Sequence, residues 1–249
     1  MSFFSIIIPT YNSSATMDRC LQSIIKQDFD AYEILVVDGA SADDTVAVAR
    51  KYQQVANLRI ISEPDEGTYD AMNKGIKLAK GQWFYFLGSD DELYADTILS
   101  KIYKTIQKRP ESRFIYGDVL TSTNTLERYS NYTYVQLMDR CICHQSIFYH
   151  KSLFQHSLYD LKFKLCADWD FNLKIFDDSI KPVYINRIVA RFDLGGASGN
   201  WMQHPEYLNH FANKRELANR YKTAAWWYGY YVPLMLFKRT KSKLRWMFQ

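Results

Sequence analysis

Two neighbouring carboxylates follow directly on an apolar run of the chain. The run Trp83–Leu87 leads through Gly88 and Ser89 into Asp90 and Asp91. A short apolar run bounded by turn residues is typical of a buried strand in a parallel sheet, and ligands bind beyond the carboxyl ends of such strands. Adjacent carboxylates repel each other unless a proton or a cation intervenes. The stretch therefore predicts a divalent-cation site completed by water and substrate phosphates. An Asp-rich turn that caps a helix is the alternative.

The elements that must position these carboxylates alternate between strands and helices as far as Pro110. Apolar runs predict strands, and apolar residues at helical spacing predict the helices between them. Strands are expected at Phe3–Pro9, Tyr32–Val37, Leu58–Ile61 and Trp83–Leu87. The first helix is expected at Met17–Ile25, capped by Ser13 or Ser14, and the second runs from a capping box at Ser41–Asp44 to Tyr52. Two further helices are expected at Tyr69–Lys80 and Ala95–Lys108. This alternation predicts an α/β fold with a mainly parallel sheet.

After Pro110 the pattern becomes less regular. Short strands or apolar stretches are expected at 114–120, 126–129 and 143–149, a short helix at 169–176, and two closing strands at 183–188 and 189–192. We expect this part to complete one domain over residues 1–198. Its first half, about 1–110, would bind the donor, and its second half, about 111–198, would bind the acceptor.

Composition indicates the compartment. The chain has 249 residues, 47% of them hydrophobic, which is enough for one large domain with an extension. No basic segment precedes the first apolar run, so no secretory signal is expected. The cysteines are few and irregularly spaced, which predicts reduced cytoplasmic thiols and gives only a weak zinc signal. They are Cys20, Cys141, Cys143 and Cys166.

The C-terminal segment differs in charge from the rest. From Lys214 onward nine Lys or Arg face one Glu, a net charge of +8, so the total of +4 leaves −4 for the remaining chain. The apolar run Thr223–Phe237 is too short to span a bilayer and contains Pro233. Its Trp and Tyr residues, followed by cations, predict that residues 199–249 form a helical extension lying on an anionic membrane surface. A packed helix or a dimer contact is the alternative, and nucleic acid is not expected as a partner.

Four motifs occur in an order that resembles a known enzyme family. SIIIPTYN, VVDGAS, LGSDDE and CADWDFNLKI follow one another between Phe3 and Ser198. This order resembles the family 2 glycosyltransferases, which are inverting enzymes of the GT-A fold. The segments EPDEGTYDAMNKGI, YGD, His144-Gln145 and GGAS resemble the bacterial branch that builds cell-surface polysaccharides. The resemblance implies a Rossmann-like sheet, a nucleotide-sugar donor such as a UDP-sugar, and a lipid-linked glycan acceptor. It also implies a protein on the inner face of the cytoplasmic membrane.

The resemblance implies a role for each motif residue at the donor site. Asp38 would accept a hydrogen bond from the uracil base, with an Asx turn before Gly39 as the alternative. Asp90 and Asp91 would hold Mg²⁺ or Mn²⁺, although the family's first acidic position is Gly88 here. The further positions implied to bind the nucleotide sugar are Pro9, Thr10, Tyr11, Asn12, Gly67, Asp70, Asn73, Lys74, Ser89 and Asp90.

One carboxylate aligns with the family's general base. An inverting transfer needs one base to take the proton of the acceptor hydroxyl, and Asp168 occupies that position. The preceding residue, an acid in the family, is Ala167 here. Asp170 is the competing carboxylate, and a helix N-cap is the alternative role for Asp168.

The remaining candidates are acceptor or flap residues. His144 and Gln145 are expected to contact the acceptor or its phosphate, with a structural role as the alternative. Residues of the GGAS segment are expected to form a flap that closes on the diphosphate, with a plain glycine turn as the alternative. The flap residues are Arg191, Gly195, Gly196 and Ser198.

Two other classes of function compete with the transferase. A non-catalytic scaffold that binds nucleotide sugars is disfavoured because both Asp90 and Asp168 are present. A dinucleotide oxidoreductase is disfavoured because no G-x-G-x-x-G motif follows the first strand.

Overall fold

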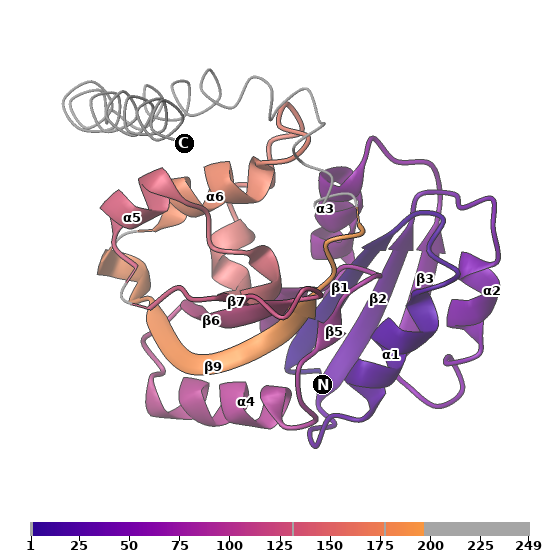
Figure 1. Ribbon diagram of the computed structural model, residues 1–249, viewed down its shortest axis with the longest axis horizontal. Coiled ribbons are helices and arrows are strands. Elements are labelled where there is room, and N and C mark those ends of the chain that lie inside the picture. Colours follow the sequence, from indigo (N-terminus) through magenta and orange to yellow (C-terminus); the bar gives the residue numbers. More distant parts are fainter. Residues whose placement is uncertain (1, 131, 177, 197–249) are drawn as a thin grey trace, which may run out of the picture.

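One curled sheet runs through the molecule (Figure 1). The structure is a computed structural model that describes residues 2–130, 132–176 and 178–196. Within these residues the strand order is β3-β2-β1-β4-β8-β6-β9-β5, and β7 pairs with β6. The first four strands are β1 Phe4–Thr10, β2 Tyr32–Asp38, β3 Leu58–Ser62 and β4 Trp83–Phe86. They are mutually parallel, as the sequence predicts.

The register of these strands aligns the candidate site residues at one edge. Thr10 at the end of β1 pairs with Asp38 at the end of β2. On the other side of β1, Ile7 pairs with Phe86, so the chain beyond β4 emerges at the same edge. β1 is buried along its whole length, which explains its continuous apolar run.

Helices cover this parallel part of the sheet. They are α1 Met17–Ile25, α2 Thr45–Arg50 and α3 Thr68–Leu78, whereas α4 Ile98–Lys108 lies beside the second half. α3 packs on β1 and β2. This packing is close at Gly75, where an added Cβ would meet the Ile7 side chain at 2.4 Å. Gly67 precedes α3 with φ +116°, a conformation that favours glycine.

The helix caps differ from those predicted. α1 is preceded by Thr16 rather than by Ser13 or Ser14, and the carbonyl of Ser13 accepts the Thr16 and Met17 N–H groups. The Ser41–Asp44 segment makes no capping box, because α2 begins only at Thr45 and its Asp44 cap forms no side-chain hydrogen bond.

The acidic and hydroxyl side chains near α2 serve loop contacts instead. Asp43 accepts from the Ser14 and Thr45 N–H groups. Ser41 donates its hydroxyl to Asp38. Tertiary contacts to the first loop have therefore overridden a local capping pattern.

The second half continues the same sheet. Its strands are β5 Glu92–Leu93, β6 Phe114–Thr121, β7 Leu126–Glu127, β8 Ile147–His150 and β9 Val183–Phe192. Its helices are α5 Tyr134–Asp139 and α6 Ala167–Ile175, with short 3₁₀ turns η1 His144–Ser146, η2 Lys151–Phe154 and η3 Asp178–Ile180. β8 runs antiparallel to both β4 and β6 and so joins the two halves.

The closing segment is one long strand, where the sequence predicts two. β9 pairs in parallel with β6, and its register shifts around Asp118, which pairs with Ile188. The predicted break between Ile188 and Val189 coincides with this irregularity. β9 bends there without ending, and the bend is visible in Figure 1.

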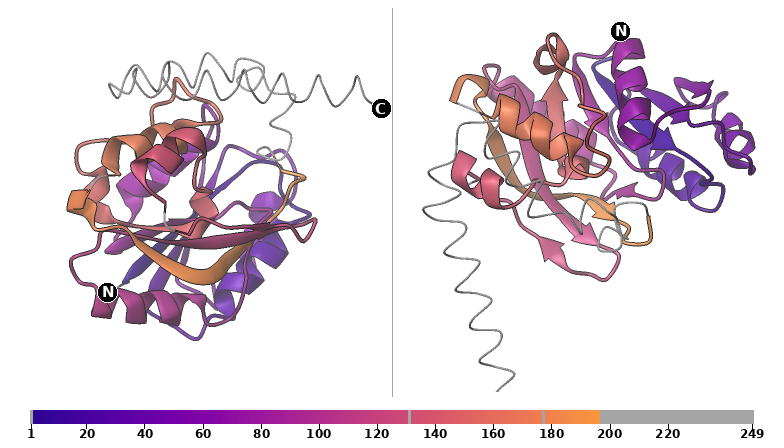
Figure 2. Two further views of the ribbon diagram at one scale, coloured as in Figure 1. Left: turned by 60° about the vertical axis from the view of Figure 1, so that its left-hand side comes forward. Right: turned by 90° about the horizontal axis from the view of Figure 1, so that it is seen from above.

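Aromatic side chains fill the core between the two halves. Tyr85 of β4 stacks on Phe148 of β8 with ring centroids 4.4 Å apart. Phe154 stacks on Phe171 of α6 at 4.5 Å. α5 and α6 lie together over one face of the second half, while α4 lies on the other (Figure 2). This packing fixes α6, and with it Asp168, against the donor half.

The membrane prediction falls on a part of the chain that the structure does not describe. Ser198 and the extension 199–249 lie outside the described residues. Within residues 2–130, 132–176 and 178–196, no helix has the length and apolar character needed to cross a bilayer. The domain boundary at 198 stays a prediction.

Candidate active site

Asp168 lies in the first turn of α6 and is held from several sides. Its Oδ1 accepts hydrogen bonds from the Tyr69 hydroxyl at 2.8 Å and from the Trp169 N–H at 2.8 Å. Its Oδ2 lies 3.3 Å from Nδ1 of His144 and 3.9 Å from Sγ of Cys141. The N-cap of α6 is Cys166, so Asp168 is not the cap residue. The competing carboxylate Asp170 is also buried on this helix.

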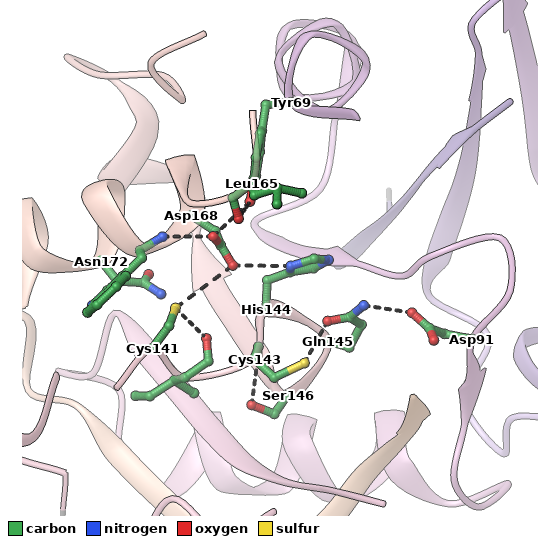
Figure 3. A network of polar contacts seen from close by, with 12 residues as sticks. Tyr69, Asp91, Cys141, Cys143, His144, Gln145, Ser146, Leu165, Asp168 and Asn172 are labelled. Atoms are coloured by element: carbon green, nitrogen blue, oxygen red, sulfur yellow. Dashed lines mark hydrogen bonds and ion pairs between the residues drawn. The ribbon is translucent and has the colours of Figure 1, made fainter. Parts of the chain in front are cut away.

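His144 and Gln145 connect Asp168 with the predicted metal carboxylates. Both lie in η1, which packs against β4, β6 and β9. His144 contacts Asp168, and Nε2 of Gln145 donates to Oδ2 of Asp91 at 2.7 Å. Figure 3 shows the two side chains reaching in different directions from adjacent backbone positions. The pair therefore fixes both acidic sites relative to each other.

Asp91 is buried and its carboxylate is committed to protein groups. Oδ1 accepts the Asp193 N–H at 2.8 Å, and Oδ2 accepts from Gln145. Burial, with repulsion from Asp90, raises the pKa of Asp91 to about 7. Two of its roughly four acceptor positions are therefore used to hold the Gln145 side chain and the segment after β9.

Asp90 is the more open carboxylate of the two. Burial and the negative charge of Asp193 raise the pKa of Asp90 above its ordinary value. An added Cβ at Gly196 would meet Oδ2 of Asp90 at 1.7 Å, so the glycine backbone lies directly against this carboxylate. At Gly88, where the family has an acid, an added Cβ would meet Oδ2 of Asp91 at 2.5 Å. The loop is thus packed around glycine at this position.

A divalent cation would find few protein ligands at this site. Within the described residues, no group of three or more His, Cys, Asp or Glu side chains is arranged to hold a metal. Asp90 nevertheless offers hard oxygen donors and has a raised pKa, which a cation would relieve. Mg²⁺ and Mn²⁺ are commonly held by one or two carboxylates with substrate phosphates. The donor set fits an ion that binds together with a diphosphate.

Asp38 is fully buried and bound to its own loop. Its carboxylate accepts from the Ser41 N–H at 3.1 Å, the Ser41 hydroxyl at 2.5 Å and the Ser62 hydroxyl at 2.6 Å. A carboxylate has about four acceptor positions, so three are occupied. The Asx-type turn that was the alternative reading is present, and contact with a base stays a prediction.

The first loop lies beside Asp38. Thr10 is buried, and its hydroxyl makes no hydrogen bond among the described residues. Pro9 is buried in β1. Tyr11 is 62% exposed, so its ring is free to stack on a ligand. Asn12 has φ 48° and accepts the Ala42 N–H, which closes the loop toward α2.

The predicted donor residues near α3 divide into two groups. Gly67 and Asp70 line a pocket of about 300 Å³, and their predicted role in donor binding stays a prediction. Asn73 is buried and uses its amide on the backbone of Tyr159, donating at 2.9 Å and accepting at 3.0 Å. Lys74 binds the Pro64 carbonyl at 2.7 Å and Glu63 at 3.1 Å. The contacts of Asn73 and Lys74 are therefore structural.

The pocket beside α3 brings residues of both halves together. It is lined by Glu66, Gly67, Thr68, Tyr69, Asp70, His144, Leu161, Phe163, Lys164 and Leu165. Two of these lining residues, His144 and Tyr69, also contact Asp168.

The remaining predicted residues have contacts of different kinds. Ser89 donates its hydroxyl to Ser13 at 2.8 Å. Arg191 lies within β9 and binds Asn124 at 3.4 Å, so it belongs to the sheet and not to a flap. The Gly195 N–H donates to Asp193 at 2.9 Å. The segment 193–196 therefore lies over the carboxylates.

Three residues of the site were missed by sequence reasoning. Tyr69 stood inside the quoted EPDEGTYDAMNKGI segment but was not singled out. Burial and the charge of Asp168 raise the pKa of Tyr69 well above its usual range, so its hydroxyl stays a donor. Arg19 binds the Asp90 carbonyl at 2.6 Å and Asp193 at 3.2 Å. Because α1 and β9 are far apart in sequence, nothing local signals Arg19 or Asp193.

The cysteines are free thiols, as predicted. Burial raises the pKa of Cys20 and Cys141 well above the usual range of a thiol. Both therefore stay protonated and are poor nucleophiles.

Comparisons with known proteins agree with this geometry. A family model described as glycosyl transferase family 2 matches residues 5–173. A PGL/p-HBAD biosynthesis glycosyltransferase of Mycobacterium bovis (strain BCG / Pasteur 1173P2) is 36% identical over 222 residues, which cover 87% of this chain and 87% of that protein.

Solved structures share the fold at low identity. S. aureus TarS 1-349 in complex with UDP-GlcNAc has a TM-score of 0.71 at 19% identity, covering 90% of this chain and 72% of that chain. The mannosyltransferase PcManGT from Pyrobaculum calidifontis, in complex with GDP-Man and Mn²⁺, has a TM-score of 0.67 at 18% identity, covering 86% of this chain and 64% of that chain. The expected GT-A fold is thereby confirmed. Because the family match spans most of the sequence and the mycobacterial relative aligns along nearly all of it, the chain belongs to glycosyl transferase family 2.

Proposed function

We propose that the protein is an inverting transferase that moves a sugar from a UDP-sugar to a hydroxyl of a lipid-linked glycan, in the synthesis of a bacterial surface polysaccharide. The observation that carries the proposal is the link through η1. His144 contacts Asp168 at 3.3 Å, and the next residue, Gln145, contacts Asp91 at 2.7 Å. This link ties the proposed base to the carboxylate loop that would face the leaving diphosphate.

The donor half would bind the nucleotide along the carboxyl edge of β1 and β2. The buried Thr10 hydroxyl has no hydrogen-bond partner within the described residues, and Tyr11 presents an exposed ring beside it. Asp38 has one acceptor position left for the N3–H of uracil. The solved TarS complex contains UDP-GlcNAc, which supports UDP and an N-acetylhexosamine as the first donor to test.

Asp90 would hold Mg²⁺ or Mn²⁺ together with the diphosphate, while Asp91 would position the loop. Such an ion acts as a Lewis acid on the leaving phosphate oxygens. The PcManGT complex contains Mn²⁺, which supports this choice. Gly196, whose backbone lies against Asp90, would let segment 193–196 close over the same group without a side chain in the way.

Asp168 would supply the basicity that the transfer needs, either directly or through the imidazole bonded to it. Tyr69 and the Trp169 N–H hold one oxygen, and His144 contacts the other. One such base on the face opposite the leaving group inverts the anomeric centre. The cavity lined by His144 and Tyr69 would place the acceptor hydroxyl or the donor sugar next to it.

The composition of the C-terminal segment supports the proposed acceptor and location of the protein. Residues 199–249 combine interfacial aromatics with a net positive charge. We propose that they hold the protein on the inner face of the cytoplasmic membrane, where a lipid-linked acceptor resides. Nucleic acid is not a proposed partner.

The function is tested by UDP release from a panel of UDP-sugars with Mn²⁺ or Mg²⁺, followed by NMR of the released sugar or product. We expect one donor to be preferred and the anomeric configuration to be inverted. Asp168→Asn should lower the rate by about 10²–10⁴-fold, the typical worth of a general base, with UDP affinity retained.

Asp170→Asn serves as the control and should be milder. Retention of the anomeric configuration would contradict the one-base mechanism. UDP binding without any release would favour a non-catalytic nucleotide-sugar-binding protein.

A further inference from the structure

The Gln145 side chain is bound by protein groups at both ends of its amide. Gln145 is only 3% exposed. Its Nε2 donates to Oδ2 of Asp91 at 2.7 Å, and its Oε1 accepts from the thiol of Cys143 at 2.7 Å. In Figure 3 the amide lies between the sulfur atom on one side and the carboxylate on the other.

These two partners allow only one orientation of the amide. Its two ends are similar in size, but the nitrogen end donates hydrogen bonds and the oxygen end accepts them. The ionised carboxylate of Asp91 can only accept, so it requires the nitrogen. The thiol of Cys143 donates its proton, so it binds the oxygen. The thiol thus keeps the donor end of Gln145 directed at Asp91.

The Cys143 thiol is suited to act as a permanent donor. Burial, with the negative charge of Asp91, raises the pKa of the Cys143 thiol, so it keeps its proton at neutral pH. The backbone of the same residue is held in place, because its carbonyl accepts from the Ser146 N–H at 2.9 Å and from the Ser146 hydroxyl at 2.7 Å. Cys143 is therefore the fixed end of the contact that leads through Gln145 to Asp91.

A second set of contacts ties Cys143 to β6. The buried Tyr129 is hydrogen-bonded to the backbone of Cys143. The Tyr129 N–H donates to Oδ1 of Asp118 at 3.0 Å, and the guanidinium of Arg140 lies 5.4 Å from the centre of the Tyr129 ring. Asp118 is the acid of the YGD segment, which thus supports the position of Cys143 from the acceptor half.

We propose that Cys143 is a positioning residue for the sugar transfer, acting through Gln145 on the acidic loop. This inference rests on the proposed function and deepens it. Without the thiol, the oxygen of Gln145 would be a buried acceptor with no donor, which is a costly arrangement. The amide would then turn away from Asp91, and the loop that carries Asp90 would lose one of its supports. The chemical step should suffer more than nucleotide binding at the edge of β1 and β2.

The first test compares two substitutions of nearly equal size in the full chain. UDP release is measured in Mn²⁺ with the UDP-sugar that wild type uses best. Cys143→Ala removes the donor and should lower kcat by about tenfold, with KM for the UDP-sugar within threefold. Cys143→Ser keeps a donor for the same oxygen and should restore kcat to within threefold of wild type. A residue that only fills space would be replaced equally well by either.

The second test is a double-mutant cycle with Gln145→Leu, which removes both ends of the amide. If Cys143 acts through Gln145, Cys143→Ala should change kcat by less than twofold in the Gln145→Leu background. Cys141→Ala is the matched control. Its thiol is in the same segment but lies 3.9 Å from Oδ2 of Asp168, so its effect on kcat should be the same in both backgrounds.

The third test observes the contact without any activity. In nucleotide-free protein, NMR measures the solvent exchange of the Gln145 side-chain N–H groups, whose signals are identified by their absence in Gln145→Leu. Exchange should be at least tenfold faster in Cys143→Ala than in wild type, and close to wild type in Cys143→Ser. Circular dichroism and calorimetry with UDP establish that each variant is folded and binds nucleotide.

The outcomes separate this inference from the proposed function. Equal kcat values for folded Cys143→Ala and Cys143→Ser would overturn the role of Cys143, as would a tenfold loss of kcat from Cys143→Ala in both backgrounds. Unchanged amide exchange in Cys143→Ala would overturn it whatever the activity. Wild type that releases UDP from none of the UDP-sugars would overturn the proposed function, while amide exchange would still decide whether the thiol holds Gln145.

Discussion

The Gln145 side chain donates to Asp91 at 2.7 Å, and it is held in turn by Cys143, whose thiol donates to Oε1 of Gln145 at 2.7 Å. The two residues lie on opposite halves of the sheet, Asp91 after β4 and Gln145 before β8. Because β4 and β8 are paired, the contact is built into the fold and requires no ligand. It holds the acidic loop at a fixed distance from α6.

Replacing Asp38 should weaken UDP binding. A hydrogen bond to a charged group contributes about 1.5–3 kcal/mol, so Asp38→Ala should lower UDP affinity by about 10–100-fold in calorimetry. Ser62→Ala is the control, because it removes one partner of the carboxylate and leaves the carboxylate in place. Equal affinity in wild type and a folded Asp38→Ala variant would remove Asp38 from the base site.

Turnover should require a divalent cation at Asp90. Excess EDTA, or Asp90→Ala, should lower UDP release by about 10²-fold or more, since a Lewis acid is worth several kcal/mol of transition-state stabilisation. Glu92→Gln is the control, because Glu92 is a neighbouring carboxylate paired with Arg19 at 3.1 Å. Full activity in EDTA would rule out the metal.

Ionisation of the buried Asp91 should lower the free energy of unfolding of the ligand-free protein as pH rises. Its folded pKa is raised to about 7, whereas an unfolded Asp titrates near 3.9. Between these values the folded state binds more protons, so this group's contribution to the free energy of unfolding falls as pH increases from about 4 to about 7. The loss is at most about 4 kcal/mol, from 1.36 kcal/mol per pKa unit.

Urea unfolding in EDTA measures this effect as a difference between two proteins. Asp91→Asn cannot titrate, so its stability relative to wild type should improve as pH rises from 4 to 7. A difference that stays constant over this range would show that Asp91 is ionised throughout.

The Tyr69 hydroxyl should matter for rate more than for nucleotide binding. Tyr69→Phe removes the hydrogen bonds to Asp168 and to the Leu165 carbonyl. Losing a hydrogen bond to a charged group costs about 1.5–3 kcal/mol, so kcat should fall by about tenfold or more while UDP affinity is kept.

Tyr159→Phe is the matched control for Tyr69. Its ring packs against Tyr69 at 5.4 Å between centroids, and its buried hydroxyl has no hydrogen-bond partner among the described residues. Thermal unfolding and kinetics should therefore show little change. A Tyr69→Phe variant as active as Tyr159→Phe would show that the hydrogen bond from Tyr69 to Asp168 does not contribute to the rate.

The C-terminal segment should bind anionic lipid. Full-length protein should sediment with vesicles that contain phosphatidylglycerol, and a chain truncated after Leu217 should not, because seven Lys or Arg follow that point. High salt should weaken the binding by screening. Equal sedimentation of both proteins, or of neither, would favour a helix packed on the body.

The sequence alone determined the α/β order of elements, because apolar runs and helical spacing are local signals. It also determined the family, and it predicted that Asp38, Asp90 and Asp168 would follow strands or begin helices at one edge. The parallel register of β1 and β2 then places Thr10 beside Asp38, as such a pattern implies.

Only the tertiary structure decided which side chains meet at the site. Tyr69 and Asp168 are 99 residues apart, and Arg19 and Asp193 are 174 apart. No periodicity in the chain encodes such pairs. The same holds for the capping box at Ser41–Asp44, where a local pattern was overridden because Ser41 and Asp43 accept hydrogen bonds from the Asn12 and Ser14 N–H groups of the first loop. A polar residue can cap a helix, line a pocket or hold a neighbouring side chain. Which of these it does depends on the groups that packing brings within hydrogen-bond distance, and those are fixed only when the strands pair and the helices pack on them.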